Sequence, residues 1–310
     1  AVTGPTVLTI GNFDGLHRGH QALLDKVRAR ANEFGPAGQA ALLTFSPHPL
    51  AVLRPEYPHQ ILTTPEERMQ LAAAAGIDFG IIQPFNAEVA AFTAQEFLNL
   101  LKTHCGLAGL IVGPDFALGR NREGDLARLQ ELGQEMDFFL DVMTPIDWES
   151  RPVRSSIIRH KLREGDVEEA RRLLGRAYAV SGQVESGDKR GRQIGVPTAN
   201  IATPAEFLLP GDGVYATVVH VLDGQAVGRY ESVTNIGVRP TVDGLHHRVE
   251  AHLLDYTPRQ HNEELYGATV RLEFLAWLRG EKRFAGLDAL TAQIRDDIAA
   301  ARTIFGVYQS

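Results

Sequence analysis

The first half of the chain alternates short apolar runs with longer segments in which apolar residues recur every three or four positions. The apolar runs predict strands at residues 7–10, 41–45, 79–83, 110–113 and 138–142. The periodic segments predict helices at residues 21–32, 65–75, 94–103 and 125–134. Strands that alternate with helices form a parallel sheet covered on both faces. We therefore expect an α/β domain in which ligands lie at the carboxyl ends of the strands.

The second half has a different pattern, made of β-type runs separated by Gly, Pro and Asp. The segment Asp166-Val167-Glu168-Glu169 predicts a capping box at the start of a short helix that Gly175 ends. After this helix, strands are expected at residues 178–184, 214–222, 227–236, 248–254 and 268–277. Successive strands without intervening helices predict an antiparallel β-barrel. We place the two domains at residues 1–176 and 177–310.

The end of the chain again shows helical periodicity. Its apolar positions, which are three or four residues apart, are Leu287, Leu290, Ile294, Ile298 and Ala301. We interpret this stripe as ordinary packing of a terminal helix against the barrel.

Composition agrees with two globular domains, because 310 residues exceed the usual size of a single core and 44% of them are hydrophobic. The net charge of −7 argues against a general nucleic-acid binder, which needs a basic excess. Cys105 is the only cysteine, so disulfides within the chain and Cys-rich metal sites are excluded. No apolar run has membrane-spanning length and no signal pattern is recognisable. We expect a cytoplasmic protein without a membrane or nucleic-acid partner.

The segment that follows the first predicted strand carries candidate chemistry. Residues 11–20 read GNFDGLHRGH, a glycine-punctuated turn that leads into a helix. His17 and His20 share one helix face, so their imidazoles can converge on one ligand. A helix N-terminus favours phosphate, and Gly19 leaves the backbone open to close approach. The segment predicts a nucleoside triphosphate site; the alternative is a turn whose histidines are solvated or act as caps.

Two further segments follow predicted strands and would meet this turn at one edge of the sheet, and a third follows the last strand of the sheet and precedes a helical stretch. The turn Ser46-Pro47-His48-Pro49 is rigid, although His48 alone is more often structural. The glycine-marked loop at residues 113–125 is suited to closing over a planar ligand, or is an ordinary surface loop. Residues 154–159 offer hydroxyls and arginines at a helix start, where Arg159 can bind phosphate bidentately. The alternative for this last segment is a serine cap with surface arginines.

These four segments together resemble the adenylyltransferase half of bacterial bifunctional riboflavin kinase/FAD synthetases, which are HxGH nucleotidyltransferases. They read GNFDGLHRGH, SPHP, GPDFALGRNREGD and RSSIIR. The second half is similar to the riboflavin kinase motifs of that family, in the same order, at GRQIGVPTAN, GVYA, NIG, VEAH and LYG. The resemblance covers essentially the whole chain. It implies a Rossmann-like nucleotidyltransferase domain followed by a riboflavin kinase barrel.

The resemblance implies that riboflavin is phosphorylated to FMN by the barrel, and that the first domain then transfers an adenylyl group from ATP to FMN, releasing pyrophosphate. ATP, riboflavin and FMN are then the substrates, with Mg²⁺ as cofactor. The chain departs from the family where Ser156 replaces a usual threonine, after Arg154 and Ser155, and where Ile157 replaces a common arginine. A hydroxyl and Arg159 remain in place.

For adenylyl transfer, the phosphate nucleophile is already ionised near neutral pH because its second pKa is about 6, so no general base is needed. Catalysis then consists of alignment and charge neutralisation, for which His17, His20 and Arg159 are the catalytic candidates. Asp14 either organises the turn or faces the nucleotide. The implied ATP site comprises Gly11, Asn12, Phe13, Asp14, Gly15, His17, His20, Ser155, Ser156 and Arg159. The implied flavin site comprises Pro47, His48, Pro49, Asp115 and Phe116.

For phosphorylation, the nucleophile is a neutral alcohol, so a base is useful, and Glu250 matches the family's catalytic glutamate. The alternative for Glu250 is a solvent-facing strand carboxylate. Thr198 and Asn200 offer oxygen ligands on one face of an extended segment, as Mg²⁺ prefers. The implied ATP site of the kinase comprises Gly187, Lys189, Gly191, Arg192, Pro197, Thr198 and Asn200, and its flavin site Asn235, Glu250 and Arg279.

Two competing functions remain open at this point. One is a flavin- or nucleotide-sensing protein built on a degenerate enzyme, although such a protein would be expected to have lost the imidazole pair or Glu250. The other is a chain that is active in only one half, for which the altered RSSIIR segment is the suspect.

Overall fold

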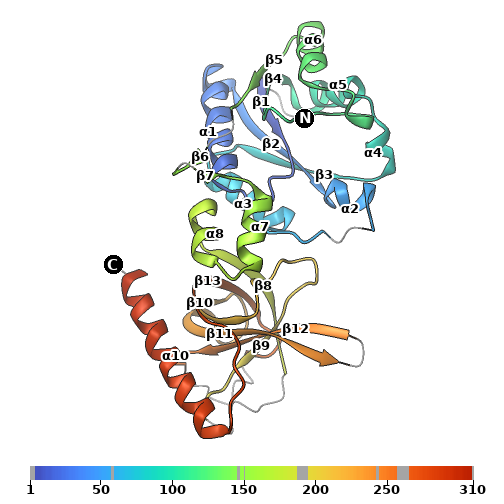
Figure 1. Ribbon diagram of the computed structural model, residues 1–310. Helices are drawn as coiled ribbons and strands as arrows, with labels where there is room; N and C mark the ends of the chain where they lie inside the picture. Colours follow the sequence, from blue (N-terminus) through green and yellow to red (C-terminus); the bar gives the residue numbers. More distant parts are fainter. Residues whose placement is uncertain are drawn as a thin grey trace. The chain divides into compact units, whose positions relative to one another are not determined.

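The computed structural model describes residues 4–56, 59–144, 147–149, 151–186, 195–241, 244–256 and 265–308. The chain forms two compact units, Ala1–Ser155 and Ser156–Ser310 (Figure 1). The first unit is an α/β sheet and the second a β-barrel, so the predicted fold class is confirmed.

Five parallel strands form the sheet of the first unit, within the residues described. They are β1 (Thr6–Ile10), β2 (Gln39–Ser46), β3 (Phe79–Pro84), β4 (Leu107–Val112) and β5 (Phe139–Val142). Their order is β3-β2-β1-β4-β5. The chain therefore moves outward in one direction from β1 and then returns to its other side at β4. In such sheets a ligand crevice lies at the carboxyl ends of the strands where the order reverses.

Helices cover both faces of this sheet (Figure 1). On one face, α1 (Arg18–Asn32) and α3 (Pro65–Ala74) enclose a core that includes Leu24, Val27 and Leu42. On the other face, α5 (Ala94–Cys105) and α6 (Leu126–Met136) pack on Leu8 and Leu110. Both α3 and α5 begin with a capping box. All four helices agree with the sequence periodicity.

The first unit also has short elements that the sequence pattern does not predict, because they are shorter than two helical turns or a regular strand. The helical ones are η1 (Gly35–Ala37), α2 (Pro49–Leu53), α4 (Ala87–Ala91) and η2 (Arg120–Arg122). A two-stranded hairpin is formed by β6 (Asp147–Trp148) and β7 (Arg151–Pro152).

The second unit is a closed antiparallel barrel with the strand order β10-β11-β12-β9-β8-β13. Its strands are β8 (Tyr178–Glu185), β9 (Ala199–Ala202), β10 (Gly213–Val221), β11 (Gly228–Thr241), β12 (Gly244–Leu253) and β13 (Thr269–Arg279). Five of them match predicted strands. The sixth, β9, joins β8 to β12 and so completes the closure. Its four residues are too few for a clear alternation in the sequence.

Two helices precede the barrel, α7 (Ser155–Arg163) and α8 (Val167–Leu174). The Asp166 side chain caps α8 by accepting from the backbone N–H of Glu169, and Gly175 ends the helix with a left-handed conformation. The carboxylate of Glu169 binds Arg172. Helix α8 packs on β8 and β13. The border between the compact units lies between Ser155 and Ser156, at the start of α7, whereas the domain boundary predicted at residues 176 and 177 follows α8.

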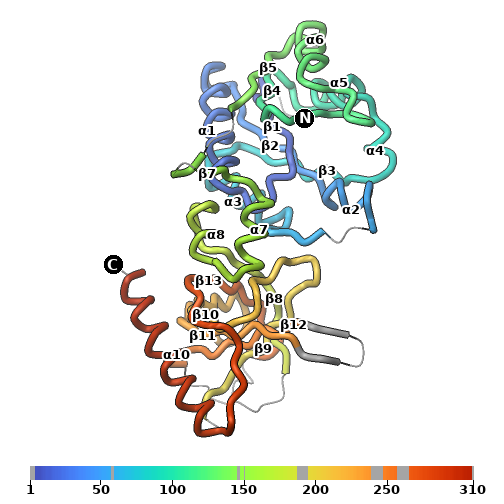
Figure 2. The backbone as a smooth tube through the Cα atoms, in the orientation of Figure 1, coloured from blue at the N-terminus to red at the C-terminus, as the bar shows by residue number. Residues whose placement is uncertain are grey.

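The terminal helix α10 (Leu287–Tyr308) runs beside the barrel, as Figure 2 shows. Ala301 and Phe305 are buried against the barrel core, and Ile298 packs beside them. Leu287, however, is 66% exposed, so the predicted packing stripe is wrong at the start of the helix. The helix packs on the barrel farther along, where the acidic residue Asp297 is buried as well.

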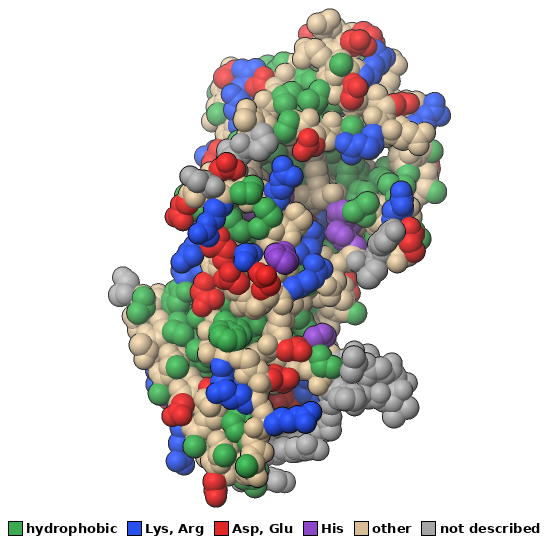
Figure 3. Space-filling model, viewed as in Figure 1, with side chains coloured by type: hydrophobic (Ala, Val, Ile, Leu, Met, Phe, Trp, Pro, Cys, Tyr) green, Lys and Arg blue, Asp and Glu red, His purple; other side chains and the backbone are tan. Residues whose placement is uncertain are grey.

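The surface carries charges of both signs. On the face shown in Figure 3, Lys and Arg side chains lie among Asp and Glu side chains over both units. Among the described residues, no helix combines the length and the apolar character that crossing a bilayer requires.

Candidate active sites

The turn between β1 and α1 is tightly folded. Phe13, Gly15 and Leu16 have positive φ angles of 48°, 83° and 38°. Glycine adopts such angles readily, whereas the two apolar residues are strained by them. Phe13 and Leu16 are each only 2% exposed and belong to the core beneath α1. Burial therefore holds the turn in a shape that sets the start of α1.

The two histidines of this turn lie against each other. The rings of His17 and His20 are stacked, with centroids 3.7 Å apart and planes inclined by 13°. His17 is the N-cap of α1, because its Nδ1 accepts a hydrogen bond from the backbone N–H of His20 at 3.3 Å. An accepting Nδ1 carries no proton, so the proton of a neutral His17 is on Nε2. His17 therefore acts as a helix cap through Nδ1, as the alternative interpretation of the turn proposed. The i,i+3 spacing also brings the two imidazoles together, as expected.

Burial lowers the pKa of His20 well below its ordinary value of 6.5, and the neighbouring His17 and Arg68 lower this pKa further. The rings of Phe13 and His20 pack in a T-shaped arrangement, with centroids 5.1 Å apart and planes inclined by 70°. At neutral pH His20 is therefore an uncharged imidazole, which can offer one N–H donor but no full charge.

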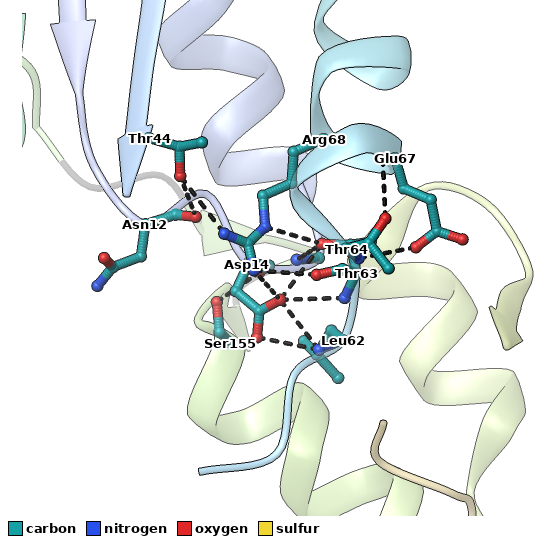
Figure 4. Close-up of polar contacts among 10 residues, drawn as sticks. Asn12, Asp14, Thr44, Leu62, Thr63, Thr64, Glu67, Arg68 and Ser155 are labelled. Carbon is teal, nitrogen blue, oxygen red and sulfur yellow. Dashed lines mark hydrogen bonds and ion pairs between the residues drawn. The ribbon is translucent and has the colours of Figure 1, made fainter. Parts of the chain in front are cut away.

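Asp14 points inward and organises the turn (Figure 4). Its side chain is 2% exposed. Both carboxylate oxygens accept from the backbone N–H of Leu62, at 2.9 and 3.0 Å, and Oδ1 also accepts from the N–H of Thr63 at 3.1 Å. The guanidinium of Arg68 completes the set with an Nη2–Oδ1 distance of 3.3 Å. Of the two roles left open for Asp14, the geometry favours that of organising the turn.

Thr63 and Arg68 are parts of this arrangement that the sequence analysis missed. Arg68 lies on α3 and is 2% exposed, which is unusual for an arginine. The available signal was the acidic Asp14 in an apolar turn, since a buried carboxylate needs a cationic or hydrogen-bonding partner. Which residue supplies that partner depends on how α3 packs, and this is not visible in the local sequence.

The start of α7 is tied to the same turn. Ser155 is the first residue of α7, and its hydroxyl donates to the backbone carbonyl of Asp14 at 2.9 Å. Ser156 and Arg159 follow on α7 and belong to the second unit. Within the first unit, the hydroxyl of Ser155 thus adjoins the histidine turn.

The predicted flavin residues after β2 form a compact corner. Pro47 follows a cis peptide bond, and Pro49 begins α2. His48 caps that helix, because its Nδ1 accepts from the backbone N–H of Leu50 at 3.1 Å. Its ring also lies on the ring of His59, with centroids 3.8 Å apart. The structural role weighed for His48 is therefore present, beside its proposed contact with flavin.

The loop after β4 supplies the other predicted flavin residues. Asp115 is exposed, and its backbone carbonyl accepts from Arg122 at 2.8 Å. Phe116 is half-buried and packs on the core under α5 and α6. Because β1, β2 and β4 are adjacent, the turns that follow these three strands lie at one edge of the sheet, as the sequence predicts.

In the barrel, strand pairing brings together the residues predicted for the kinase site. Glu250 on β12 is paired with Asn200 on β9 and with Asn235 on β11. The row continues through Val214 on β10 to Arg279 on β13. Side chains of directly paired residues in antiparallel strands lie on the same face of the sheet. One face of the barrel therefore carries the predicted base, a predicted metal ligand and both other predicted flavin residues.

Glu250 has two neighbours on its own strand that the sequence analysis did not use. Arg248 donates to Glu250 with an Nη1–Oε1 distance of 3.0 Å. His252 Nδ1 lies 2.8 Å from the carbonyl oxygen of Pro197, and because that oxygen only accepts, Nδ1 carries the proton. The available signal was the spacing, since residues 248, 250 and 252 share one face of a strand.

Arg279 has a structural role in addition to any contact with flavin. Its Nε and Nη2 donate to the carboxylate of Asp297 on α10, at 2.9 and 2.7 Å, and its Nη1 donates to the Gly280 carbonyl. Gln293 also donates to Asp297. The arginine thus anchors α10 to the barrel.

The remaining predicted kinase residues are only partly described. Gly187, Lys189, Gly191 and Arg192 lie outside the described residues. Pro197 and Thr198 are half-buried and directly precede β9. In the described part of the chain, no three His, Cys, Asp or Glu side chains are grouped as metal ligands. The proposed Mg²⁺ ligands Thr198 and Asn200 offer a hydroxyl and an amide oxygen, which are not among these four residue types.

Comparisons with known proteins cover both units. The model of the FAD synthetase family matches residues 1–157, and that of the riboflavin kinase family matches residues 174–305. A bifunctional riboflavin kinase/FMN adenylyltransferase of Escherichia coli K12 is 37% identical over 302 residues, which cover 97% of this chain and 93% of the relative. Relatives with the same description are 38% identical in Pseudomonas fluorescens, over 96% and 92% of the chains, and 33% identical in Bacillus subtilis, over 94% and 90%.

Among solved structures, a chain from Streptococcus pneumoniae has the same fold. It matches with a TM-score of 0.87 and 27% identity, over 97% of this chain and 95% of its own length. Its title names a macrolide-efflux protein, a description that differs from that of the curated relatives.

Proposed function

Because the chain belongs to the family of bifunctional riboflavin kinase/FMN adenylyltransferases, we propose that His17 and His20 serve adenylyl transfer and that Glu250 serves phosphorylation. The barrel phosphorylates riboflavin to FMN with ATP, and the N-terminal unit transfers an adenylyl group from ATP to FMN, giving FAD and pyrophosphate. The observation that carries the assignment of residues is their grouping: one unit holds the stacked imidazoles and the other holds the row of Asn200, Glu250 and Asn235.

In the adenylyltransferase, the residues align two anions and disperse the charge of the leaving pyrophosphate. The FMN phosphate attacks the α-phosphorus of ATP as a dianion, so no base is assigned. His20 is a neutral donor beside His17 at the N-terminus of α1, and Ser155 and Ser156 are assigned as hydroxyl donors at the start of α7. On the strength of the sequence motif, Arg159 is assigned to supply positive charge for the phosphates, since the low pKa of His20 leaves its imidazole uncharged.

The flavin half of this site is assigned to the turns after β2 and β4. Pro47, His48 and Pro49 form one wall, and Asp115 and Phe116 form the other. Support comes from their position at the same sheet edge as the histidine turn. The flavin phosphate and the α-phosphate of ATP would then meet at the carboxyl ends of the strands.

In the kinase, Glu250 accepts the proton of the riboflavin 5′-hydroxyl as that oxygen attacks the γ-phosphorus of ATP, whose bond to the bridging oxygen breaks and releases ADP. Arg248 fixes the carboxylate through its bond to Oε1. Asn235, next to Glu250 on the neighbouring strand, is assigned to the flavin, together with Arg279. Gly187, Lys189, Gly191 and Arg192 are assigned to ATP phosphates on the strength of the sequence motif.

Thr198 and Asn200 suit Mg²⁺, because a hydroxyl and an amide oxygen are hard ligands that leave positions for water and phosphate oxygens. Asn200 is paired with Glu250, so a cation held there would be close to the proposed base. Bound Mg²⁺ would neutralise the charge of the transferring phosphate. We also propose that the protein is cytoplasmic and that its partners are these small molecules.

The assignment is tested by incubating the purified chain with riboflavin, ATP and Mg²⁺ and separating the products by chromatography. FMN followed by FAD is the expected result. FMN without FAD would indicate that only the kinase is active, and the absence of any flavin product would favour a sensing role. Omission of Mg²⁺ should abolish both steps, and retention of either step would contradict the proposed cofactor.

A further inference from the structure

Arg68 is a buried cation to which neither reaction assigns a role. It lies on α3, is 2% exposed and makes contacts in several directions. Its Nη2 donates to the Thr63 carbonyl at 2.9 Å and to Asp14 Oδ1 at 3.3 Å. Its Nε donates to the Thr63 hydroxyl at 3.3 Å, and its Nη1 to the Thr44 hydroxyl at 3.4 Å. Burial of a guanidinium is unfavourable unless its charge and its donors find partners in this way.

Through these partners Arg68 is connected to three residues of the histidine turn. The Thr44 hydroxyl donates to the Asn12 carbonyl at 3.0 Å. Asp14 is bound directly, and the backbone N–H of Gly15 donates to the Thr63 hydroxyl at 2.9 Å. Figure 4 shows this network between β2, the turn and α3.

A role limited to stability does not explain this arrangement well. A buried ion pair is often no more stabilising than apolar residues of the same volume, so its presence points to a need for defined geometry. The turn has such a need, because Phe13 and Leu16 adopt strained positive φ angles just before the histidines. The guanidinium is also one of the charges that lower the pKa of His20.

We propose that Arg68 is a positioning residue of the adenylyltransferase, which fixes Asn12, Asp14 and Gly15 so that the two imidazoles meet the phosphates of ATP. Arg68 acts through the turn and touches no substrate. This inference rests on the proposed assignment of adenylyl transfer to the histidine turn.

The test compares three full-length variants in FAD formation from supplied FMN and ATP. Arg68→Met removes the charge and all donors, and we expect FAD formation to fall by about 10²-fold, as misplacement of a site by about 1 Å can cause. Arg68→Lys keeps the charge next to Asp14 and should stay within about tenfold of the unmodified chain. Val27→Ala is the matched control, because Val27 is 0% exposed in the core of the same sheet face and has no part in the network.

Each rate is divided by the folded fraction taken from urea unfolding, and riboflavin phosphorylation by the barrel is measured on the same sample. We expect phosphorylation to be unchanged in all three variants. After this correction, Val27→Ala should match the unmodified chain. Equal corrected losses in Arg68→Met and Val27→Ala, or no corrected loss in Arg68→Met, would overturn the proposal.

A second readout follows the histidine rings by NMR. Arg68 and His17 are the cationic or titratable groups that act on His20, Asp14 is bound to Arg68, and the Phe13 ring packs against the His20 ring. Arg68→Met should raise the pKa of His20, because it removes a nearby cation that lowers this pKa, whereas Val27→Ala should not change it. An unchanged pKa of His20 in Arg68→Met would contradict the proposal.

If Arg68→Met does not fold, Thr44→Val provides the test, since it removes the link from Arg68 to Asn12 while conserving shape. About tenfold slower FAD formation is expected, the effect of one hydrogen bond worth roughly 1.4 kcal/mol, and an unchanged rate would overturn the proposal.

His20→Ala is measured in parallel. If His20→Ala retains FAD formation, the assignment of the site is wrong; if it loses FAD formation while the variants of the network do not, the role of Arg68 is wrong.

Discussion

Glu250 and Asn200 occupy directly paired positions on β12 and β9, so the proposed base and a proposed metal ligand lie side by side on the barrel. They are brought together by register alone, since fifty positions separate them in the sequence. A shift of β9 by one residue would turn Asn200 to the face of the sheet opposite Glu250. The longer pairing of β12 with β11 fixes the face that carries Glu250, and the pairing with β9, the shortest strand of the barrel, brings Asn200 to it.

The bond between His252 and Pro197 joins the strand of the base to the segment of Thr198 and Asn200. We expect His252→Ala to release that segment and to raise the KM of the kinase for ATP about tenfold, the effect of one hydrogen bond worth roughly 1.4 kcal/mol. FAD formation from FMN should not change. His247→Ala on the same strand, where His247 is exposed and pairs with Asp212, is the control. Equal kinase kinetics in the two variants would show that the bond has no positioning role.

The pKa of His20, which burial lowers, makes stability depend on pH. Below about pH 6.5 the unfolded chain binds a proton at His20 that the folded chain does not. The free energy of unfolding is therefore unaffected by His20 above that pH and decreases as the pH falls below it. The loss approaches about 1.4 kcal/mol per pH unit for one proton. Urea unfolding should show a shallower loss of stability on acidification in His20→Gln than in the unmodified chain. Parallel pH dependences would mean that His20 titrates normally in the folded protein.

The ion pair between Arg279 and Asp297 is expected to hold α10 on the barrel, because both side chains are largely buried, at 15% and 6% exposure. Asp297→Ala leaves the guanidinium unpaired and should lower the free energy of unfolding by about 3–5 kcal/mol. Leu287→Ala, on the exposed start of the same helix, should change it by no more than about 0.5 kcal/mol. Denaturant titration measures both. A small effect of Asp297→Ala would leave contact with flavin as the main role of Arg279.

The two possible domain borders differ by α7 and α8, and fragments distinguish them. Fragments 156–310 and 177–310 both contain the proposed kinase residues, so both should convert riboflavin to FMN without forming FAD. The longer fragment should resist more urea, because α8 buries Val167, Leu173 and Leu174 in the intact chain. A folded fragment without kinase activity would show that the N-terminal unit contributes to the second site. Equal stability would show that α8 adds nothing to the barrel.

The sequence predicts the elements whose periodicity is long enough to recognise. The five sheet strands, the four main helices of the first unit and the closed barrel all agree with the structure. Short elements such as α2 and β9 escape prediction because four or five residues do not display a period. Their structure depends on neighbouring strands and caps.

At the sites, motif spacing predicts which residues meet when one element carries them all, as His17 and His20 show. It does not predict partners supplied by another element. The inward orientation of Asp14 follows from Leu62, Thr63 and Arg68, which the fold brings to the turn. In the same way, the carboxylate of Asp297 forms an ion pair with the guanidinium of Arg279. Such pairings depend on tertiary packing and become visible only in the structure.

The division of the two reactions between Glu250 and the histidine turn is tested most directly by a crossed assay of Glu250→Gln and His20→Ala. Riboflavin and FMN are supplied separately with ATP, and circular dichroism checks that each variant is folded. Glu250→Gln should lower FMN formation by about 10²–10⁴-fold, the range for a positioned base, and leave FAD formation near its normal rate. His20→Ala should lower FAD formation by about 10²-fold or more and leave FMN formation intact. Matched losses of both activities in either variant, or normal FMN formation in Glu250→Gln, would contradict this division.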